Sequence, residues 1–141
     1  MHDIIKKTRK EVIKMGCFYT GFDWRNRKNG YFKIGETSGK TPAARLAQIR
    51  REDAFQCLGY LILKGETKAE RLFVESYTRM QMERVPGLDH TQNDHYLYKI
   101  ESKDRKYAQA YEFANIALNH AMDACRMINV SFELGTKTYK R

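Results

Sequence analysis

Two aromatic-rich segments that flank a short polar stretch limit the fold of this chain more than any other feature. Residues 17–22 (CFYTGF) and 31–36 (YFKIGE) lie on either side of the sequence DWRNRKNG, which ends in Asn29-Gly30. An Asn-Gly pair between aromatic runs is typical of a β-hairpin, because both residues adopt the backbone angles of a tight turn. The pattern therefore predicts two antiparallel strands joined by a long, basic connection.

A helix, a strand and a second helix are expected after the hairpin. Thr41 suits the N-cap and Pro42 the first position of a helix over about 41–51. The nearly continuous apolar run at 55–64 predicts a strand that is buried on both faces. The capping-box sequence TKAE starts a helix over about 67–84. The apolar face expected for that helix consists of Leu72, Phe73, Tyr77 and Met80.

The remaining segments complete a single predicted domain over residues 1–141. We expect a basic amphipathic helix at 2–15, a polar loop at 89–95, a short strand at 96–100, a long helix at 103–126 and an added edge strand at 129–134. The fold class that follows is α/β, with a central antiparallel three-stranded sheet flanked by helices. An extra N-terminal helix and a long C-terminal helix are expected beside this core.

The composition favours a polyanionic partner. Lys and Arg total 26 against 17 Asp and Glu, which gives a formal charge of +9. A basic protein without such a partner is the alternative. Cys17, Cys57 and Cys125 form no CxxC pair, so we expect buried, reduced thiols in a cytoplasmic protein rather than a disulfide framework or a zinc ribbon. No apolar run approaches the roughly 20 residues that span a bilayer, so no membrane segment is expected.

The order hairpin, helix, strand, helix resembles the GIY-YIG nuclease superfamily. The chain is most similar to the phage-type branch, whose second motif reads Tyr-Lys-Ile-Gly. Cys17-Phe18-Tyr19 stands for the first motif and Lys33-Ile34-Gly35 for the second. The resemblance implies a GIY-YIG-like core at about 16–100, from a phage or a mobile element. It also implies a metal-dependent endonuclease that hydrolyses phosphodiester bonds of DNA with Mg²⁺ or Mn²⁺.

The resemblance assigns roles to particular residues of the site. Tyr19 would be the general base or would position water, and a nearby cation such as Lys33 would favour the phenolate. Arg45 would bind the scissile phosphate through its planar guanidinium. Glu70 would hold Mg²⁺, an ion that needs only one or two protein carboxylates. Tyr31 would be a second phenol of the site.

Each of these residues also has a structural interpretation. Tyr19 and Tyr31 could be packing residues of strands, and Lys33 could point outward. Glu70 is the fourth residue of the capping box and could serve only the helix end. Glu75 is a rival metal ligand, which lies about 140° further around the helix.

An aromatic side chain beside several cations marks the hairpin connection. Stacking on an aromatic ring combined with neutralisation of phosphates holds single strands and distorted duplexes. The alternative is a solvated loop with its tryptophan tucked against the core. The predicted nucleic-acid-binding residues are Trp24, Arg25, Arg27, Lys28, Lys40 and Arg50.

Acidic residues and histidines gather in the segment DHTQNDH. Their spacing matches no standard zinc motif, so we interpret Asp89, His90, Asp94 and His95 as a polar surface loop. His95 could still carry a proton if the loop folds over the site.

Two other functions stay open. Cys17 replaces the first glycine of the family, and Ile49 stands where many members carry a histidine. These departures favour a catalytically inactive nucleic-acid-binding domain. Alternatively, the helix at 103–126 could pair with a partner or with a second copy in a homodimer. That protein-interaction hypothesis predicts an exposed apolar face on the last helix.

Overall fold

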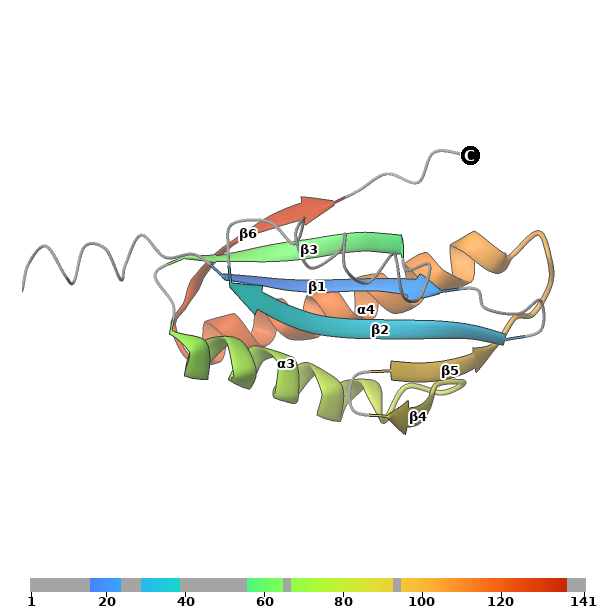
Figure 1. Ribbon diagram of the computed structural model, residues 1–141, viewed down its shortest axis with the longest axis horizontal. Coiled ribbons are helices and arrows are strands. Elements are labelled where there is room, and N and C mark those ends of the chain that lie inside the picture. Colours follow the sequence, from blue (N-terminus) through green and yellow to red (C-terminus); the bar gives the residue numbers. More distant parts are fainter. Residues whose placement is uncertain (1–15, 24–28, 39–55, 65–66, 93–94, 137–141) are drawn as a thin grey trace, which may run out of the picture.

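One antiparallel sheet with two helices on one side makes up the described part of the chain (Figure 1). The computed structural model describes residues 16–23, 29–38, 56–64, 67–92 and 95–136. The sheet has six strands in the order β4-β5-β2-β1-β3-β6. The elements are β1 (Gly16–Asp23), β2 (Asn29–Ser38), β3 (Gln56–Lys64), α3 (Lys68–Met82), β4 (Asp89–Gln92), β5 (His95–Lys99), α4 (Lys106–Met127) and β6 (Ser131–Thr136).

The predicted hairpin is confirmed and lies at the centre of the sheet. β1 pairs with β2 in an antiparallel register that places Tyr19 opposite Gly35. β3 pairs with the other edge of β1 and places Tyr60 opposite Tyr19. β1 is therefore hydrogen-bonded on both sides, and its side chains project from the two buried faces of the sheet.

The predicted three-stranded sheet is wrong. Residues 89–92, which we expected in a polar loop, form β4 and pair with β5. β5 in turn pairs with the outer edge of β2, and β6 pairs with the outer edge of β3. A three-stranded sheet would leave the N–H and C=O groups of β2 and β3 unpaired at its edges, and these added strands satisfy them. The helices predicted at 2–15 and 41–51 lie outside the described residues.

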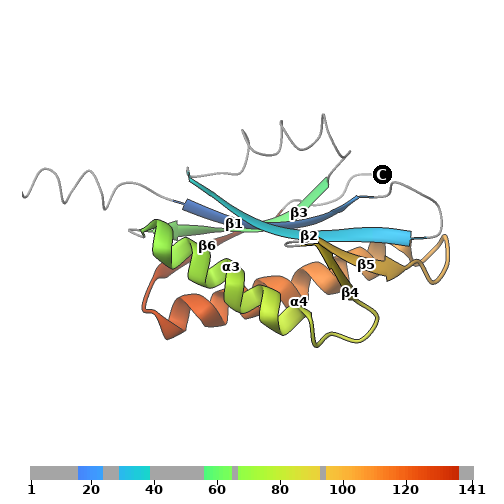
Figure 2. The ribbon, with the colours of Figure 1, turned by 60° about the horizontal axis from the view of Figure 1, so that its bottom comes forward.

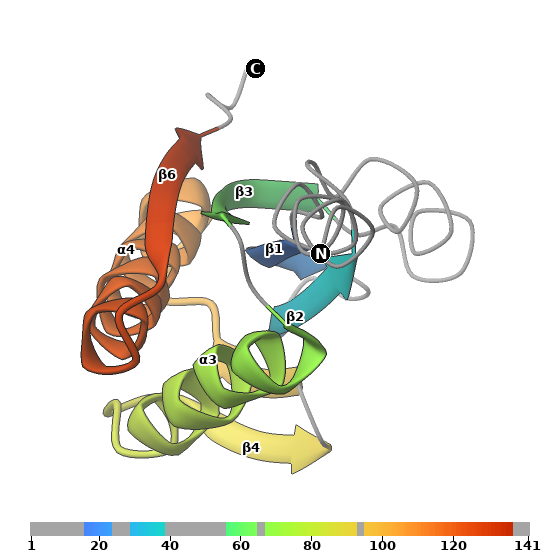
Figure 3. The same cartoon turned by 90° about the vertical axis from the view of Figure 1, so that its left-hand side faces the viewer.

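The sheet has two chemically different faces. The helix face packs against α3 and α4, which lie side by side beneath it (Figures 2 and 3). Side chains alternate along each strand, so the neighbouring residues project from the other side, which we call the opposite face. The helix face carries Phe18, Phe22, Phe32, Ile34, Leu61, Leu63, Tyr96 and Tyr98. The opposite face carries Cys17, Tyr19, Tyr31, Lys33, Cys57 and Tyr60.

The apolar face predicted for α3 is wrong in large part. The residues that α3 buries are Val74, Thr78 and Met82. Thr78 can be buried because its Oγ1 donates to the Val74 carbonyl oxygen at 2.7 Å. Leu72, Phe73 and Met80 are instead exposed, and of the four predicted residues Tyr77 alone packs against the core.

α4, in contrast to α3, buries its apolar side chains and exposes mostly polar ones. It buries an alanine-rich stripe that includes Ala110, Ala114, Ala117, Ala121 and Ala124, and these small side chains let it approach the sheet closely. Its exposed positions are mostly polar: Glu112, Asn115, Asn119, Asp123 and Arg126. The structure therefore does not show the apolar face that the protein-interaction hypothesis predicted for this helix. Neither described helix is long and apolar enough to cross a bilayer.

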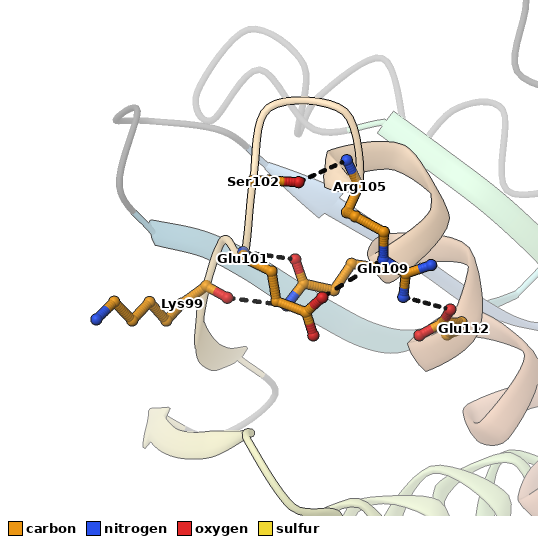
Figure 4. A network of polar contacts seen from close by, with 6 residues as sticks. All are labelled: Lys99, Glu101, Ser102, Arg105, Gln109 and Glu112. Carbon is orange, nitrogen blue, oxygen red and sulfur yellow. Dashed lines mark hydrogen bonds and ion pairs between the residues drawn. The ribbon is translucent and has the colours of Figure 1, made fainter.

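A polar network fixes the start of α4 against the end of β5 (Figure 4). The buried Gln109 side chain donates from Nε2 to the Lys99 carbonyl oxygen at 2.8 Å and accepts from the Glu101 N–H at 3.2 Å. Both ends of a buried amide are thus satisfied, as a buried polar group requires. Arg105 adds exposed ion pairs with Glu101 and Glu112.

Candidate functional site

Three predicted site residues lie on the opposite face of β1 and β2. Lys33 stands opposite Gly21, and Tyr31 stands two residues before Lys33 on the same strand. Tyr19 is therefore a diagonal neighbour of Lys33, and such neighbours have Cβ atoms on the order of 7 Å apart. The strand register therefore places these two phenols and this ammonium group on one side of the sheet.

Gly35 makes room for the ring of Tyr19. A Cβ atom at residue 35 would lie 2.5 Å from both Cζ and Oη of Tyr19, which is far inside van der Waals contact. Tyr19 is 1% exposed, so its ring has little space in which to move aside. Because Gly35 of the second motif has no side chain, the Tyr19 phenol has room to lie over β2.

Tyr60 is a third phenol that the sequence analysis did not assign to the site. It lies directly opposite Tyr19, and Cys57 on the same strand lies opposite Gly21. Tyr19, Cys57 and Tyr60 form a small cluster separate from the main core. The apolar run at 55–64 predicted the strand, but only the register between β1 and β3 brings Tyr60 to Tyr19.

Lys33 is a buried cation, with 6% of the residue exposed. The residue opposite it on β1 is Gly21, which offers no side chain, and the residue opposite it on β5 is His95. A charged group in such a place is costly unless polar groups surround it. Among the described residues that are buried, Lys33 is the one with a charged side chain.

Glu70 forms the predicted capping box. The Thr67 N–H donates to Glu70 Oε1 at 2.8 Å, and the Glu70 N–H donates to Thr67 Oγ1 at 3.3 Å. α3 packs on the helix face, whereas Tyr19 belongs to the opposite face. The cap uses one carboxylate oxygen, and a carboxylate carries two. Glu70 therefore begins a helix and still has an oxygen that a cation could take.

Glu75, the rival ligand, forms an ion pair with Arg79 one turn later. A second ion pair connects the strand of the second motif with the helix that carries Glu70. Arg71 Nε donates to Glu36 Oε2 at 2.9 Å, with side chains only 13% and 18% exposed. Arg71 directly follows Glu70, and Glu36 directly follows Gly35. This pair fixes the first turn of α3 to the strand that carries Lys33, and the sequence analysis did not foresee it.

His90 is engaged within the protein. Its Nδ1 lies 3.2 Å from Glu83 Oε1, and its ring centroid lies 5.1 Å from that of Tyr96. Among the residues that the structure describes, no group of three or more His, Cys, Asp and Glu side chains is placed to hold a metal ion.

All three cysteines are free and buried, as the sequence predicted. Burial raises the pKa of Cys17 to about 12, and nearby Cys57 adds to the effect. Burial also raises the pKa of Cys125 to about 11. Only a thiolate is an effective nucleophile, and burial disfavours the thiolate form of Cys17.

Several predicted site residues lie outside the described part of the chain. They are Trp24, Arg25, Arg27, Lys28, Lys40, Arg45, Ile49, Arg50 and Asp94. His95 is described only through its backbone pairing.

Comparisons with models of known families, with curated proteins and with solved structures found no match for this chain.

Proposed function

We propose that this protein is a metal-dependent endonuclease that hydrolyses phosphodiester bonds of DNA. The observation that carries the proposal is the shared opposite face of β1 and β2, where the register gathers Tyr19, Tyr31 and Lys33. Tyr19 and Lys33 are buried there and Tyr31 is half-buried. A buried ammonium group is more than packing requires, since apolar side chains fill such positions at lower cost.

The chemistry of hydrolysis gives each group a task. Water must lose a proton, the phosphorus centre must have its charge neutralised, and the leaving oxygen must be stabilised. A phenol ordinarily ionises near pH ~10, so a phenol that serves as base needs a cation close by. Lys33 is that cation for Tyr19, and Arg45 supplies the bidentate contact to phosphate.

Glu70, whose helix packs on the other face of the sheet from Tyr19, is the proposed ligand of Mg²⁺ or Mn²⁺ through the carboxylate oxygen that the cap does not use. When bound, the metal would stabilise the charge on the departing oxygen. The ion pair between Arg71 and Glu36 would hold the start of α3 in a constant position relative to β2.

The net charge of +9 supports DNA as the partner. Cations that neutralise phosphates release counterions, and this release drives binding without reading sequence. DNA binding by this chain is therefore expected to weaken steeply with salt.

A second candidate function is a nucleic-acid-binding domain without catalysis. The observation that favours it is the capping role of Glu70, which accounts for this glutamate without any metal. The two candidates differ in one property: whether the charge of the Glu70 carboxylate matters beyond the helix end.

Plasmid nicking with Mg²⁺ or Mn²⁺ tests this property with three variants. Glu70→Gln keeps a side chain that can serve the capping box but removes the charge that a metal needs. Thr67→Ala removes the Oγ1 acceptor, costs about 1 kcal/mol of stability and leaves the carboxylate in place. Tyr19→Phe keeps the ring over Gly35 and removes only the hydroxyl.

We expect wild type and Thr67→Ala to nick at rates within a few-fold of each other. Glu70→Gln and Tyr19→Phe should each lose roughly a hundredfold or more. Salt-sensitive DNA binding with no nicking by the wild type would establish the second candidate. Nicking that Glu70→Gln retains would exclude Glu70 as the metal ligand.

A further inference from the structure

Two tyrosines and two glycines form one row across the middle strands of the sheet. The strands β2, β1, β3 and β6 lie side by side in this order (Figure 1). Their registers pair Tyr19 with Gly35 on one side and with Tyr60 on the other, and they pair Tyr60 with Gly135. We call these four residues the tyrosine row. All four positions belong to the opposite face, because directly paired residues project from the same side of a sheet.

The two tyrosine rings of this row turn away from each other. The Tyr19 ring lies over Gly35 on β2. A Cβ atom at residue 135 would lie 2.3 Å from Cζ and 2.8 Å from Oη of Tyr60, so the Tyr60 ring reaches over the β6 backbone in the same way. The two hydroxyl groups therefore lie above β2 and β6, which are three strand spacings or roughly 14 Å apart. This separation is too long for both phenols to act on one phosphate.

Tyr60 differs from Tyr19 in exposure. Tyr19 is 1% exposed, whereas Tyr60 is only partly buried against the cluster of Tyr19 and Cys57. The β6 backbone supports the Tyr60 ring from beneath, and part of this side chain stays accessible. Unpaired bases stack on accessible aromatic rings of this kind, because every base has a flat aromatic face.

The two ends of the tyrosine row differ in charge. At the β2 end, Lys33 supplies a buried cation. At the β6 end, the next residue of β3 on the same face as Tyr60 is the buried Ile62. Beyond it, Lys64 forms an ion pair with Glu133 at 3.3 Å, so these two charges offset each other. A nucleotide has the same asymmetry, since its phosphate is an anion and its base is an uncharged aromatic group. The phosphate therefore fits the end with Lys33, and the base fits Tyr60.

We propose that Tyr60 is a nucleic-acid contact on which an unpaired base stacks, next to the nucleotide whose phosphate lies at Tyr19. The inference rests on the proposed function for the identity of the ligand. It adds the class of substrate, which is DNA with a single-stranded or locally unpaired segment at the cleaved site. A base inside an intact duplex is covered on both faces by its neighbours and cannot stack on Tyr60 unless it leaves the helix.

Fluorescence anisotropy of the full chain measures this contact on two labelled DNAs, a single strand and the same sequence as an intact duplex. EDTA is present so that no DNA is cleaved. Tyr60→Leu removes the ring and should weaken binding of the single strand about tenfold, which is about 1.4 kcal/mol. Binding of the duplex should change by less than about twofold. Tyr60→Phe keeps the ring and should bind the single strand like the wild type.

The matched control is Tyr77→Leu. Tyr77 is also half-buried, but it lies on α3 and packs against the core on the other side of the sheet. This variant should bind both DNAs like the wild type. Salt then separates stacking from a phosphate contact. Loss of one phosphate contact reduces the slope of log affinity against log salt by roughly 0.7 for a single strand, whereas Tyr60→Leu should leave the slope unchanged.

Photo-cross-linking tests the same contact in the wild type and needs no variant. Single strands that carry iododeoxyuridine at successive positions are irradiated in complex with the full chain, and the linked residue is identified by mass spectrometry. A base stacked on Tyr60 should cross-link to that residue. Cross-links that never include Tyr60 would overturn the inference, whether or not Tyr60→Leu is folded in thermal melts.

The outcomes for this contact and for the nuclease activity are distinguishable. Equal binding of the single strand by the wild type and by folded Tyr60→Leu would overturn the inference, and the nicking assay would still decide the nuclease activity. A loss in Tyr60→Phe as large as that in Tyr60→Leu would also overturn it, because the ring is retained there. Weaker binding by Tyr60→Leu in a protein that does not nick would support the contact and exclude the nuclease. A wild type that binds neither DNA would overturn both.

Discussion

The helix face and the opposite face of the same strands are both buried, yet their chemistry differs. On the helix face, Phe32 and Ile34 pack with the aliphatic and alanine side chains of two helices. On the opposite face, the neighbouring residue Tyr31 carries a phenol and Lys33 an ammonium group. Gly35 has no side chain and leaves room for the Tyr19 ring. Burial and phenols are common to both faces, since the helix face buries Tyr96 and Tyr98. The chemical difference between them is the buried ammonium group of Lys33 on the opposite face.

The largest effect expected concerns stability and falls on the helix face. Phe32 is fully buried and its ring centroid lies 6.0 Å from that of Phe113. Phe32→Ala should lower the free energy of unfolding by about 3–5 kcal/mol, because the lost contacts leave a cavity. Urea unfolding followed by circular dichroism measures it. Tyr31→Ala is the matched control on the adjacent residue of the opposite face. Equal losses in both variants would remove the distinction between the faces.

A smaller loss of stability is expected for Gly35→Ala, on the opposite face. The new methyl group would lie 2.5 Å from Tyr19 Oη, so the ring must shift in a place where it is 1% exposed. We expect a loss of about 1–3 kcal/mol in the same unfolding assay. If the opposite face is the nuclease site, nicking should fall further than this loss explains. Unchanged nicking would show that the position of the Tyr19 phenol does not matter to activity.

The smallest effect concerns pH and compares one cysteine from each region. The pKa of Cys17 is raised from 9.0 to about 12 and that of Cys125, in the helix-face core, to about 11, both chiefly by burial. A raised pKa means that only the unfolded chain releases the proton above pH 9.0. The stability that each thiol contributes is therefore fully present below pH 9.0 and is lost as pH rises toward the folded-state value.

Urea unfolding at a series of pH values from neutral pH into the range above pH 9.0 measures the loss. The decline with pH should be shallower in Cys17→Ala than in the wild type, and Cys125→Ala should show a smaller change of slope. A larger change for Cys125→Ala would mean that the helix-face core desolvates its thiol more strongly than the opposite face does.

Local signals in the sequence predicted the elements but not their partners. The hairpin of β1 and β2, the strand in 55–64 and the capping box at Thr67 depend on neighbouring residues, and all three are found in the structure. Asn29 and Gly30 do not form the predicted turn, because they lie within β2 and pair with Lys99 and Tyr98. The polar side chains of segment 89–92 predict a loop, whereas the structure has β4 there. Its pairing with β5 uses backbone groups, which every sequence of that length provides.

The orientation of α3 shows the same limit. Two stripes of this helix could have served as its inner face, one with Leu72, Phe73 and Met80 and one with Val74, Thr78 and Met82. The periodicity of the sequence favoured the first, and the structure buries the second. The Arg71 ion pair with Glu36, which joins residues 35 positions apart, belongs with that orientation and is invisible to a local pattern.

The sequence by itself determined the hairpin strands, the strand in 55–64, the start of α3 and the burial of the thiols. These features depend on residues a few positions apart, whose geometry the backbone sets. The tertiary structure alone decided that six strands pair, that Tyr60 joins Tyr19, and that α3 turns its apolar stripe outward. Those outcomes depend on contacts between residues that are far apart in the sequence. Many such contacts together determine the free energy of the fold, so no single segment predicts it.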